Sequence, residues 1–203
     1  MPDTLARTML ARAALRFNAQ GGFAPLPPLI FLTDDERTPD PLPAIAALPR
    51  GSLVIVRSRD KARRRELAHA AARIARSRAL MLSVASDAAL AAEVAADGLH
   101  LSESEIGSTG HHRLHPRLLT CAAHSAQSLS RAHRAGAHAV LLSPVFATQS
   151  HAQRAGLGIA RLRAIVRASP IAVYALGGIT AENVAQLNGI PLAGIAAIGA
   201  LLP

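Results

Sequence analysis

Residues 171–203 read IAVYALGGITAENVAQLNGIPLAGIAAIGALLP and hold two short apolar runs separated by a stretch of helical pattern. The runs are Ile171–Leu176 and Gly194–Ile198, and Thr180 is predicted to open the helix between them. Both runs are continuously apolar rather than alternating, which is typical of strands that are buried on both faces. This stretch therefore predicts two parallel strands joined by a crossover.

The same alternation extends upstream over most of the chain. Six further apolar runs predict strands at Leu29–Thr33, Leu53–Arg57, Leu80–Val84, Gly98–Leu101, Leu118–Ala122 and Ala139–Ser143. Asp87 and Ser125 are predicted to begin two of the intervening helices, and Gly136 to end the second. Eight strands with short crossovers predict a closed (β/α)₈ TIM barrel, formed as a single domain over residues 1–203.

The segment before the first strand is predicted to help close this barrel. The sequence ends at Pro203, just after the eighth predicted strand, so we expect no C-terminal helix after that strand. Thr4–Phe17 has the pattern of an amphipathic helix, which we expect to cover the seam between the eighth and first strands. Pro39, Pro41 and Pro43 predict that the helix after the first strand is short.

The composition excludes several classes of protein. Five residues are aromatic, too few for the stacking platforms that hold single-stranded nucleic acid. No apolar run reaches about 18 residues, so a membrane-spanning helix and a membrane partner are not expected. Cys121 is the only cysteine, which excludes an intramolecular disulfide and a multi-cysteine zinc site. A cytoplasmic location is the expectation.

The formal net charge of +9 comes almost entirely from arginine. Such a balance is compatible with nucleic acid or small anions as partners. We interpret the dense cluster Arg57–Arg65 as a solvated helix face, so nucleic acid is not an expected partner. We also interpret His111, His112 and His115 as solvent-facing, because no carboxylate or cysteine accompanies them.

Several polar residues and glycines lie where predicted strands end, which is where (β/α)₈ barrels carry their chemistry. Gly177 and Gly178 follow the seventh strand and Gly199 follows the eighth, and backbone amides in such loops can cradle a phosphate. His124 lies at the end of the fifth strand, where a histidine can exchange protons near neutral pH. A tight turn and a structural histidine are the alternative interpretations.

Charged residues lie at the same edge of the predicted sheet. Arg57 and Arg59 end the second strand, where guanidinium groups can hold a diphosphate. Glu103 and Glu105 follow the fourth strand and can offer oxygen ligands to a hard cation. Their shared position makes these individually ordinary residues candidates for one site.

Three stretches resemble the thiamine phosphate synthase and thiazole tautomerase superfamily. They are ADGLHLSESE (Ala96–Glu105), AAHSAQSLSRAHRAGAHAVLLSPVFATQS (Ala122–Ser150) and ALGGITAENV (Ala175–Val184), followed by GIAAIGAL (Gly194–Leu201). The stretch SPVFATQS resembles the family's Gly-Pro-Ile-Phe/Tyr-x-Thr-x-Ser/Thr loop. The resemblance implies a TIM barrel that acts on a thiazole phosphate in thiamine biosynthesis.

Two activities are implied by this resemblance. The synthase joins a pyrimidine diphosphate to a thiazole phosphate, with loss of diphosphate and help from Mg²⁺. The tautomerase moves a proton to aromatise a thiazole carboxylate phosphate and needs no metal or other cofactor. In both, the thiazole phosphate would contact the positions that are here Gly177, Gly178, Ile198 and Gly199, the last in place of a family serine.

The diphosphate half of the resemblance is less complete. The family's Gln-x-Arg-x-Lys pattern falls on Ile55, Arg57 and Arg59, so the glutamine is absent. A family lysine falls on His151, near Arg154. The residues left to bind the diphosphate or other parts of the substrate are Arg57, Arg59, Thr148, Ser150 and His151.

The metal-binding positions also differ. The family's Asn-Asp pair falls on Ala85 and Ser86, which removes one carboxylate, and Asp87 lies one residue further along. A second family aspartate falls on Glu105. If the protein is a synthase, Glu105 and Asp87 are the candidate Mg²⁺ ligands.

Because the departures are confined to the diphosphate and metal half, the leading hypothesis is a tautomerase-like enzyme in which His124 is the acid and base. A diverged synthase that binds Mg²⁺ is the alternative, and a non-catalytic binder of a phosphorylated ligand is a third reading. The expected partners are a phosphorylated thiazole and, for a synthase, a pyrimidine diphosphate. A homodimer is left open.

Overall fold

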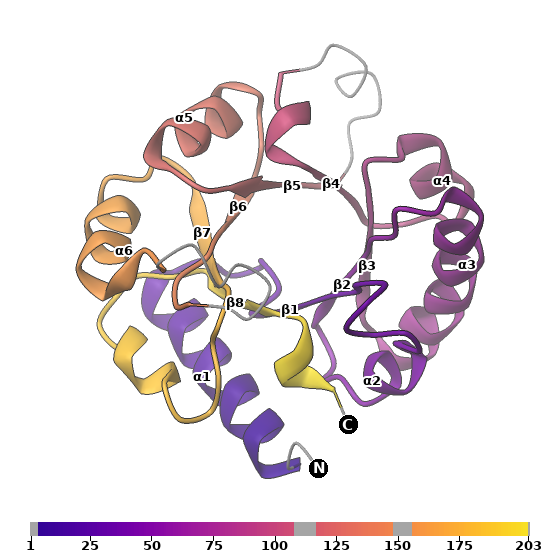
Figure 1. Cartoon of the computed structure of the whole chain (residues 1–203), viewed down its shortest axis with the longest axis horizontal. Helices are drawn as coiled ribbons and strands as arrows, with labels where there is room; N and C mark the ends of the chain where they lie inside the picture. The colour runs from indigo at the N-terminus through magenta and orange to yellow at the C-terminus, as the bar shows by residue number, and fades with distance from the viewer. Residues whose placement is uncertain (1–3, 108–116, 148–155, 203) are drawn as a thin grey trace.

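The computed structural model describes residues 4–107, 117–147 and 156–202, and its strands form a closed barrel (Figure 1). All eight strands are parallel and follow one another in chain order, with β8 paired to β1. The strands are β1 Leu29–Leu32, β2 Leu53–Val56, β3 Met81–Ala85, β4 Gly98–Leu101, β5 Leu118–Ala123, β6 Ala139–Leu142, β7 Ala172–Leu176 and β8 Gly194–Ala197. The predicted TIM-barrel fold is therefore confirmed, and every predicted strand is present.

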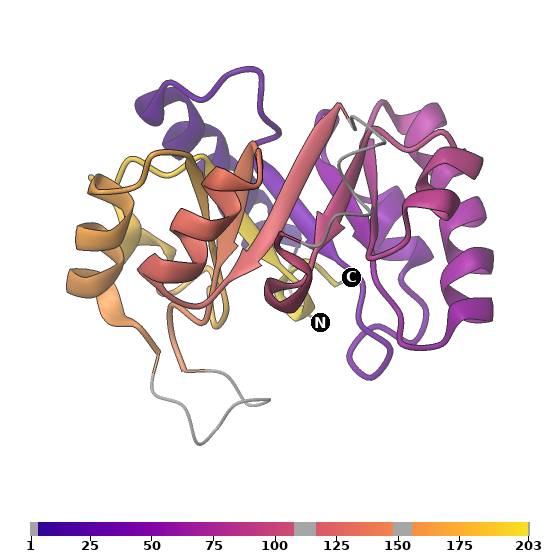
Figure 2. The ribbon, with the colours of Figure 1, turned by 90° about the horizontal axis from the view of Figure 1, so that it is seen from above.

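Helices surround the closed sheet, as the side view in Figure 2 also shows. The α-helices are α1 Thr4–Gly21, α2 Leu42–Ala46, α3 Lys61–Arg78, α4 Ala88–Glu93, α5 Ala126–Arg134 and α6 Gly158–Arg167. Short 3₁₀ helices are η1 Glu103–Glu105, η3 Val184–Leu187 and η4 Gly199–Leu201. The short α2 agrees with the prediction from the prolines. None of the described helices has the length and apolar character needed to cross a membrane.

The prediction that the first helix covers the seam is confirmed. α1 packs on β8 and β1, and Phe17 on the inner side of this helix is fully buried. Asn18 Nδ2 donates hydrogen bonds to the carbonyl oxygens of Ala193, 2.8 Å away, and Leu26, 3.1 Å away. Within the described residues, β8 is followed only by η4 and no α-helix. α1 therefore takes the position that a helix after β8 would occupy.

The prediction that a helix begins at Thr180 is wrong. The chain forms a turn there and then only η3. The side chain of Asn183 accepts a hydrogen bond from Thr180 N at 2.9 Å and donates one to Gly178 O at 2.7 Å. These bonds hold a turn where the first turn of a helix was expected, because Asn side chains compete with helical backbone bonding.

Side chains along each strand alternate between the barrel interior and the surrounding helices. Ile55, Leu141 and Tyr174 belong to the interior layer, whereas Val54 and Val173 belong to the layer that packs against helices. Both layers are buried, which explains why the strands are continuously apolar in sequence.

Candidate functional site

The structure places the predicted site residues of the described segments at one end of the barrel, where the strands end. They follow neighbouring strands in order around the rim: Arg57 and Arg59 after β2, Asp87 after β3, Glu105 after β4, His124 after β5, Gly177 and Gly178 after β7, and Ile198 and Gly199 after β8. Thr148, Ser150, His151 and Arg154 lie outside the described residues, as do His111, His112 and His115.

The loop after β1 holds Arg57 in place. The buried Thr33 hydroxyl accepts a hydrogen bond from Arg57 N at 2.8 Å and donates one to Arg57 O at 2.9 Å. The guanidinium of Arg57 forms an ion pair with Asp34 and is half exposed. Asp34 is itself fixed, because Thr38 bonds to both its backbone N–H and its backbone carbonyl at 2.7 Å.

Asp35 holds Ser58 and Arg59, the next two residues after Arg57, in place. Its Oδ2 accepts hydrogen bonds from Arg59 N at 2.9 Å and from the Ser58 hydroxyl at 3.1 Å. Partial burial acts to raise the pKa of Asp35. The hydrogen bonds from Arg59 and Ser58 oppose it, and nearby guanidinium groups add to them, so the pKa lies below its ordinary value. The carboxylate stays ionised at neutral pH and fixes the backbone that carries Arg59.

The two candidate metal ligands are both engaged by other parts of the chain. Asp87 caps α4 by accepting a hydrogen bond from Leu90 N at 3.0 Å, and Arg64 lies 3.3 Å from its other oxygen. Glu105 Oε2 accepts hydrogen bonds from Ser102 N at 2.8 Å and from the Ser86 hydroxyl at 2.7 Å. The described residues contain no group of three or more His, Cys, Asp or Glu that is placed to hold a metal ion.

His124 lies between the loops after β4 and β6. Its Nδ1 is 2.8 Å from the carbonyl oxygen of Ser143, and because a carbonyl only accepts, Nδ1 carries the hydrogen. In the neutral ring Nε2 is then the unprotonated nitrogen, 3.9 Å from Glu103 Oε2. Glu103 also accepts a hydrogen bond from His124 N at 3.1 Å. This geometry leaves Nε2 able to accept a proton.

The glycine pair after β7 is required by close packing. Gly177 and Gly178 have φ of +98° and +67°, a region that favours glycine. A Cβ on Gly178 would lie 2.6 Å from Ala147 O, and one on Gly177 would lie 2.9 Å from the Cα of Pro144. Gly199, after the neighbouring strand, has nothing within 4 Å of such a Cβ. The first two glycines therefore let the β7 loop approach the β6 loop.

A buried histidine lies below the rim. His100, on β4, projects into the barrel, and its Nδ1 is 2.9 Å from the Thr120 hydroxyl. Burial lowers the pKa of His100 to about 4; the Arg57 charge adds to this effect and the Glu105 charge opposes it. The charges of Arg57 and Glu105 therefore both affect the pKa of His100, inside the barrel.

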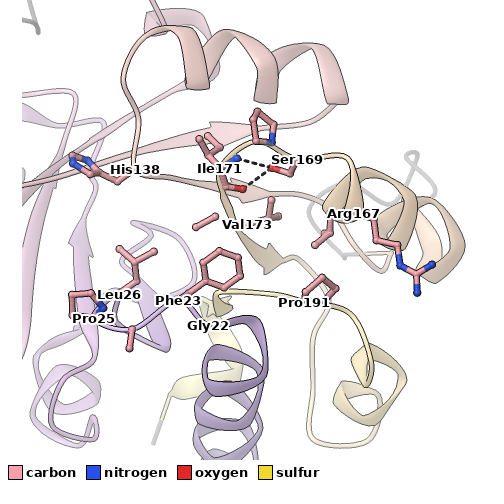
Figure 3. Close-up of a pocket in the computed structure, with 14 residues that line it drawn as sticks. Gly22, Phe23, Pro25, Leu26, His138, Arg167, Ser169, Ile171, Val173 and Pro191 are labelled. Atoms are coloured by element: carbon pink, nitrogen blue, oxygen red, sulfur yellow. Dashed lines mark hydrogen bonds between the residues drawn. The ribbon is translucent and has the colours of Figure 1, made fainter.

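A cavity of about 560 Å³ lies at the opposite end of the barrel, where strands begin (Figure 3). Phe23 and Leu26 form one wall of it, and Ile171 and Val173 form another. Ser169 on its edge bonds to the backbone of Ile171. None of the predicted site residues that the structure describes lines this cavity.

Thr33, Asp34 and Asp35 are functional candidates that the sequence analysis missed. The signal was present, since two acids follow directly after the first predicted strand. Their partners lie 23 or 24 residues further along, and only the β1–β2 register brings them together.

Comparison with known proteins identifies relatives over most of the chain. Residues 29–201 match the family described as "Thiamine monophosphate synthase". A protein of Aquifex aeolicus is 36% identical over 124 residues, which are 61% of this chain and 66% of that protein. The thiamine-phosphate synthase of Herpetosiphon aurantiacus is 32% identical over 168 residues, covering 80% of this chain and 82% of that protein.

The match to other relatives is shorter. The thiamine-phosphate synthase of Methanoregula boonei is 37% identical over 110 residues, which span about half of each protein, 53% of this chain and 51% of the relative. Among solved structures, a thiamine phosphate pyrophosphorylase from Pyrococcus furiosus superposes with a TM-score of 0.68 at 21% identity, over 84% of each chain. At that identity the superposition supports the barrel fold alone.

Proposed function

Because the chain belongs to the thiamine monophosphate synthase family, we propose that it binds a thiazole phosphate and joins it to a pyrimidine diphosphate at the rim of the barrel. The observation that carries this proposal is the extent of the family match, residues 29–201, which includes every candidate site residue. The names of the relatives favour this synthase reading over the tautomerase-like reading that led the sequence analysis.

The proposed reaction makes one bond and breaks one. The thiazole nitrogen bonds to the methylene carbon of the pyrimidine, while the bond from that carbon to the diphosphate oxygen breaks. The diphosphate leaves with the electron pair. We propose that the guanidinium groups of Arg57 and Arg59 neutralise its negative charge, since the loop after β1 holds the backbones of both residues at the rim.

The thiazole phosphate is assigned to the other side of the rim. Backbone amides around Gly177, Gly178, Ile198 and Gly199, in the loops after β7 and β8, are the usual phosphate cradle of such barrels. Thr148, Ser150 and His151 remain proposed substrate contacts, and no geometry is assigned to them.

Mg²⁺ is the cofactor that the resemblance implies for a synthase. Mg²⁺ is usually bound through one or two carboxylates while keeping several waters. Here Asp87 caps a helix and faces Arg64, and one oxygen of Glu105 already accepts hydrogen bonds from Ser86 and Ser102. The residues present do not fit such a site, so we derive no step through the metal.

A second candidate function is tautomerase-like proton transfer. The observation that favours it is the tautomer of His124, whose Nδ1–H is held by Ser143 O while Nε2 is left as the base. In this reaction Nε2 would take a proton from one ring position of the thiazole carboxylate phosphate and return it to another.

The synthase proposal is tested by incubating the purified chain with both substrates, with and without Mg²⁺, and measuring thiamine phosphate by chromatography. We expect product, and we expect Arg59→Ala to lower kcat/KM by about one to two orders of magnitude, since it removes a charge-assisted bond. Arg78→Ala, at the far end of α3, is the matched control and should keep full activity. A folded protein that gives no product at saturating substrates contradicts the proposal.

The tautomerase candidate needs a separate assay with the thiazole carboxylate phosphate alone. Wild type should isomerise it and His124→Ala should not, if His124 carries the proton. Equal rates for the two proteins would remove His124 from that role. Tight binding of the thiazole phosphate with turnover in neither assay would indicate a non-catalytic binder.

A further inference from the structure

We propose that the diphosphate half of this site binds its anion through arginine side chains alone, without a divalent cation. This inference rests on the proposed function for the identity of the anion. It follows from how the chain itself engages the two carboxylates that a cation would need, and from the guanidinium groups beside them.

The first carboxylate is already paired with a cation of the protein. Arg64 Nη2 lies 3.3 Å from Asp87 Oδ2, and the Arg64 side chain is only 12% exposed. A second hydrogen bond, from Arg64 Nη1 to Ser58 O at 3.2 Å, fixes this guanidinium between the loops after β2 and β3. Asp87 Oδ1 is used to cap α4. Moving Asp87 onto a metal ion would expose the helix end and leave a largely buried arginine without its counter-charge.

The second carboxylate is held by hydroxyl and amide donors. Glu105 Oε2 lies 2.5 Å from the Ser102 hydroxyl, 2.7 Å from the Ser86 hydroxyl and 2.8 Å from Ser102 N. The contact with Ser86 joins the ends of β3 and β4, the two strands whose loops carry the candidate metal ligands. The hydroxyl satisfies the hydrogen bonding of the carboxylate but carries no charge. A second carboxylate in its place would add the negative charge that a divalent cation needs.

Positive charge is available on the neighbouring strand. Arg57 is half exposed at the rim and already pairs with Asp34, whereas the guanidinium of Arg59 forms no ion pair with any described residue. Both backbones are fixed by the loop after β1, so only the side chains have to be ordered when an anion binds. Guanidinium groups bind phosphate oxygens in a bidentate manner, which is how they can take over the charge neutralisation that a metal ion supplies elsewhere.

The test is calorimetric titration of the whole chain with inorganic pyrophosphate, once in EDTA and once with excess MgCl₂. We expect binding in EDTA, and excess Mg²⁺ should leave it unchanged or weaken it, because Mg²⁺ complexes pyrophosphate and lowers the charge that the guanidinium groups attract. Binding that is tighter by about tenfold or more with Mg²⁺ overturns the proposal, and so does the absence of binding in both buffers.

Variants connect the binding to these residues. Arg59→Ala should weaken pyrophosphate binding in EDTA by about tenfold or more, whereas Arg78→Ala should leave it unchanged. If Arg59→Ala binds as well as wild type, the arginines are not the receptor of the anion and the proposal fails.

A metal titration gives an independent readout. Mn²⁺ added to the protein without pyrophosphate is followed by the paramagnetic resonance signal of the free ion. Wild type should leave this signal unchanged into the millimolar range, whereas Ser86→Asp, which restores a second carboxylate beside Glu105, should reduce it. Ser86 has φ of +58°, a conformation that Asp tolerates better than most residues, so the variant should fold. Loss of the free Mn²⁺ signal with wild type contradicts the proposal.

These results separate the inference from the proposed function. Thiamine phosphate formed only in the presence of Mg²⁺ would support the function and overturn the inference. Pyrophosphate binding in EDTA without product from the two substrates would support the inference and count against the function.

Discussion

The two glycines after β7 differ from Gly199 in what their positions tolerate. At Gly178 a Cβ would meet Ala147 O at 2.6 Å and the backbone has φ of +67°. We expect Gly178→Ala to lower the free energy of unfolding by about 1–3 kcal/mol, as measured by urea denaturation. Gly199→Ala is the matched control, because its Cβ meets nothing within 4 Å, and it should change stability by less than about 0.5 kcal/mol. Equal effects at both positions would contradict the packing argument.

His100 predicts a specific dependence of stability on pH. Its pKa is about 4 in the folded chain, whereas the ordinary value is 6.5, so the unfolded chain takes up the proton first as the pH falls. The folded state should lose on the order of 3 kcal/mol of stability as the pH falls from 6.5 through 4. Chemical denaturation across this range should show the loss in wild type. His100→Gln should show a smaller loss over the same range, and an unchanged loss would assign the effect to other groups.

The junction of β1 and β2 depends on one hydroxyl. Thr33→Val keeps the shape of the side chain but leaves the Arg57 N–H and carbonyl without their partner. We expect a loss of about 1–3 kcal/mol in the free energy of unfolding, because leaving polar groups unpaired at a partly buried position costs up to about that much. Thr33→Ser retains the hydroxyl and should recover most of the loss. If valine and serine behave alike, the hydroxyl is not the important group.

At the scale of single elements, the strands were predictable and some helices were not. A strand buried on both faces is a short continuous apolar run, and such runs located all eight strands to within a residue or two. The segment after Thr180 has a helical pattern, yet Asn183 folds it into a turn and only Val184–Leu187 becomes helical. Hydrogen bonds of one side chain to nearby backbone outweighed the pattern.

The candidate site was predictable only in its position on the fold. The rule that chemistry lies where barrel strands end selected Arg57, Arg59 and His124. The contacts that engage Asp87 and Glu105 could not be predicted, because they depend on how the loops of different strands meet. Nothing in the sequence indicates that Arg64 pairs with Asp87 or that Ser86 donates to Glu105.

The seam helix gives a prediction about packing. Phe17 is fully buried between α1 and the strands, whereas Leu15 on the same helix is 57% exposed. We expect Phe17→Ala to lower the free energy of unfolding by about 3–5 kcal/mol and Leu15→Ala to change it by less than about 0.5 kcal/mol. Urea denaturation of the two variants measures the difference. A small effect of Phe17→Ala would mean that α1 does not seal the barrel in solution.

For the whole molecule, closure of the sheet predicts cooperative unfolding. Each strand is paired on both sides, and β8 returns to β1, so any group of strands that stayed folded alone would have two unpaired edges. We expect a single transition in differential scanning calorimetry, which is the behaviour of one domain over the whole chain. Two resolved transitions would contradict that prediction.

The hydrogen bond from Asn18 to Ala193 joins residues 175 positions apart, and it has a consequence for how the protein is made. On the ribosome, α1 and β1 emerge early, but the part of α1 that packs on β8 finds its partner only after β8 has been synthesised. Contacts of such long sequence separation form slowly. The barrel therefore closes only when the last strand has been made, however early its first helix forms.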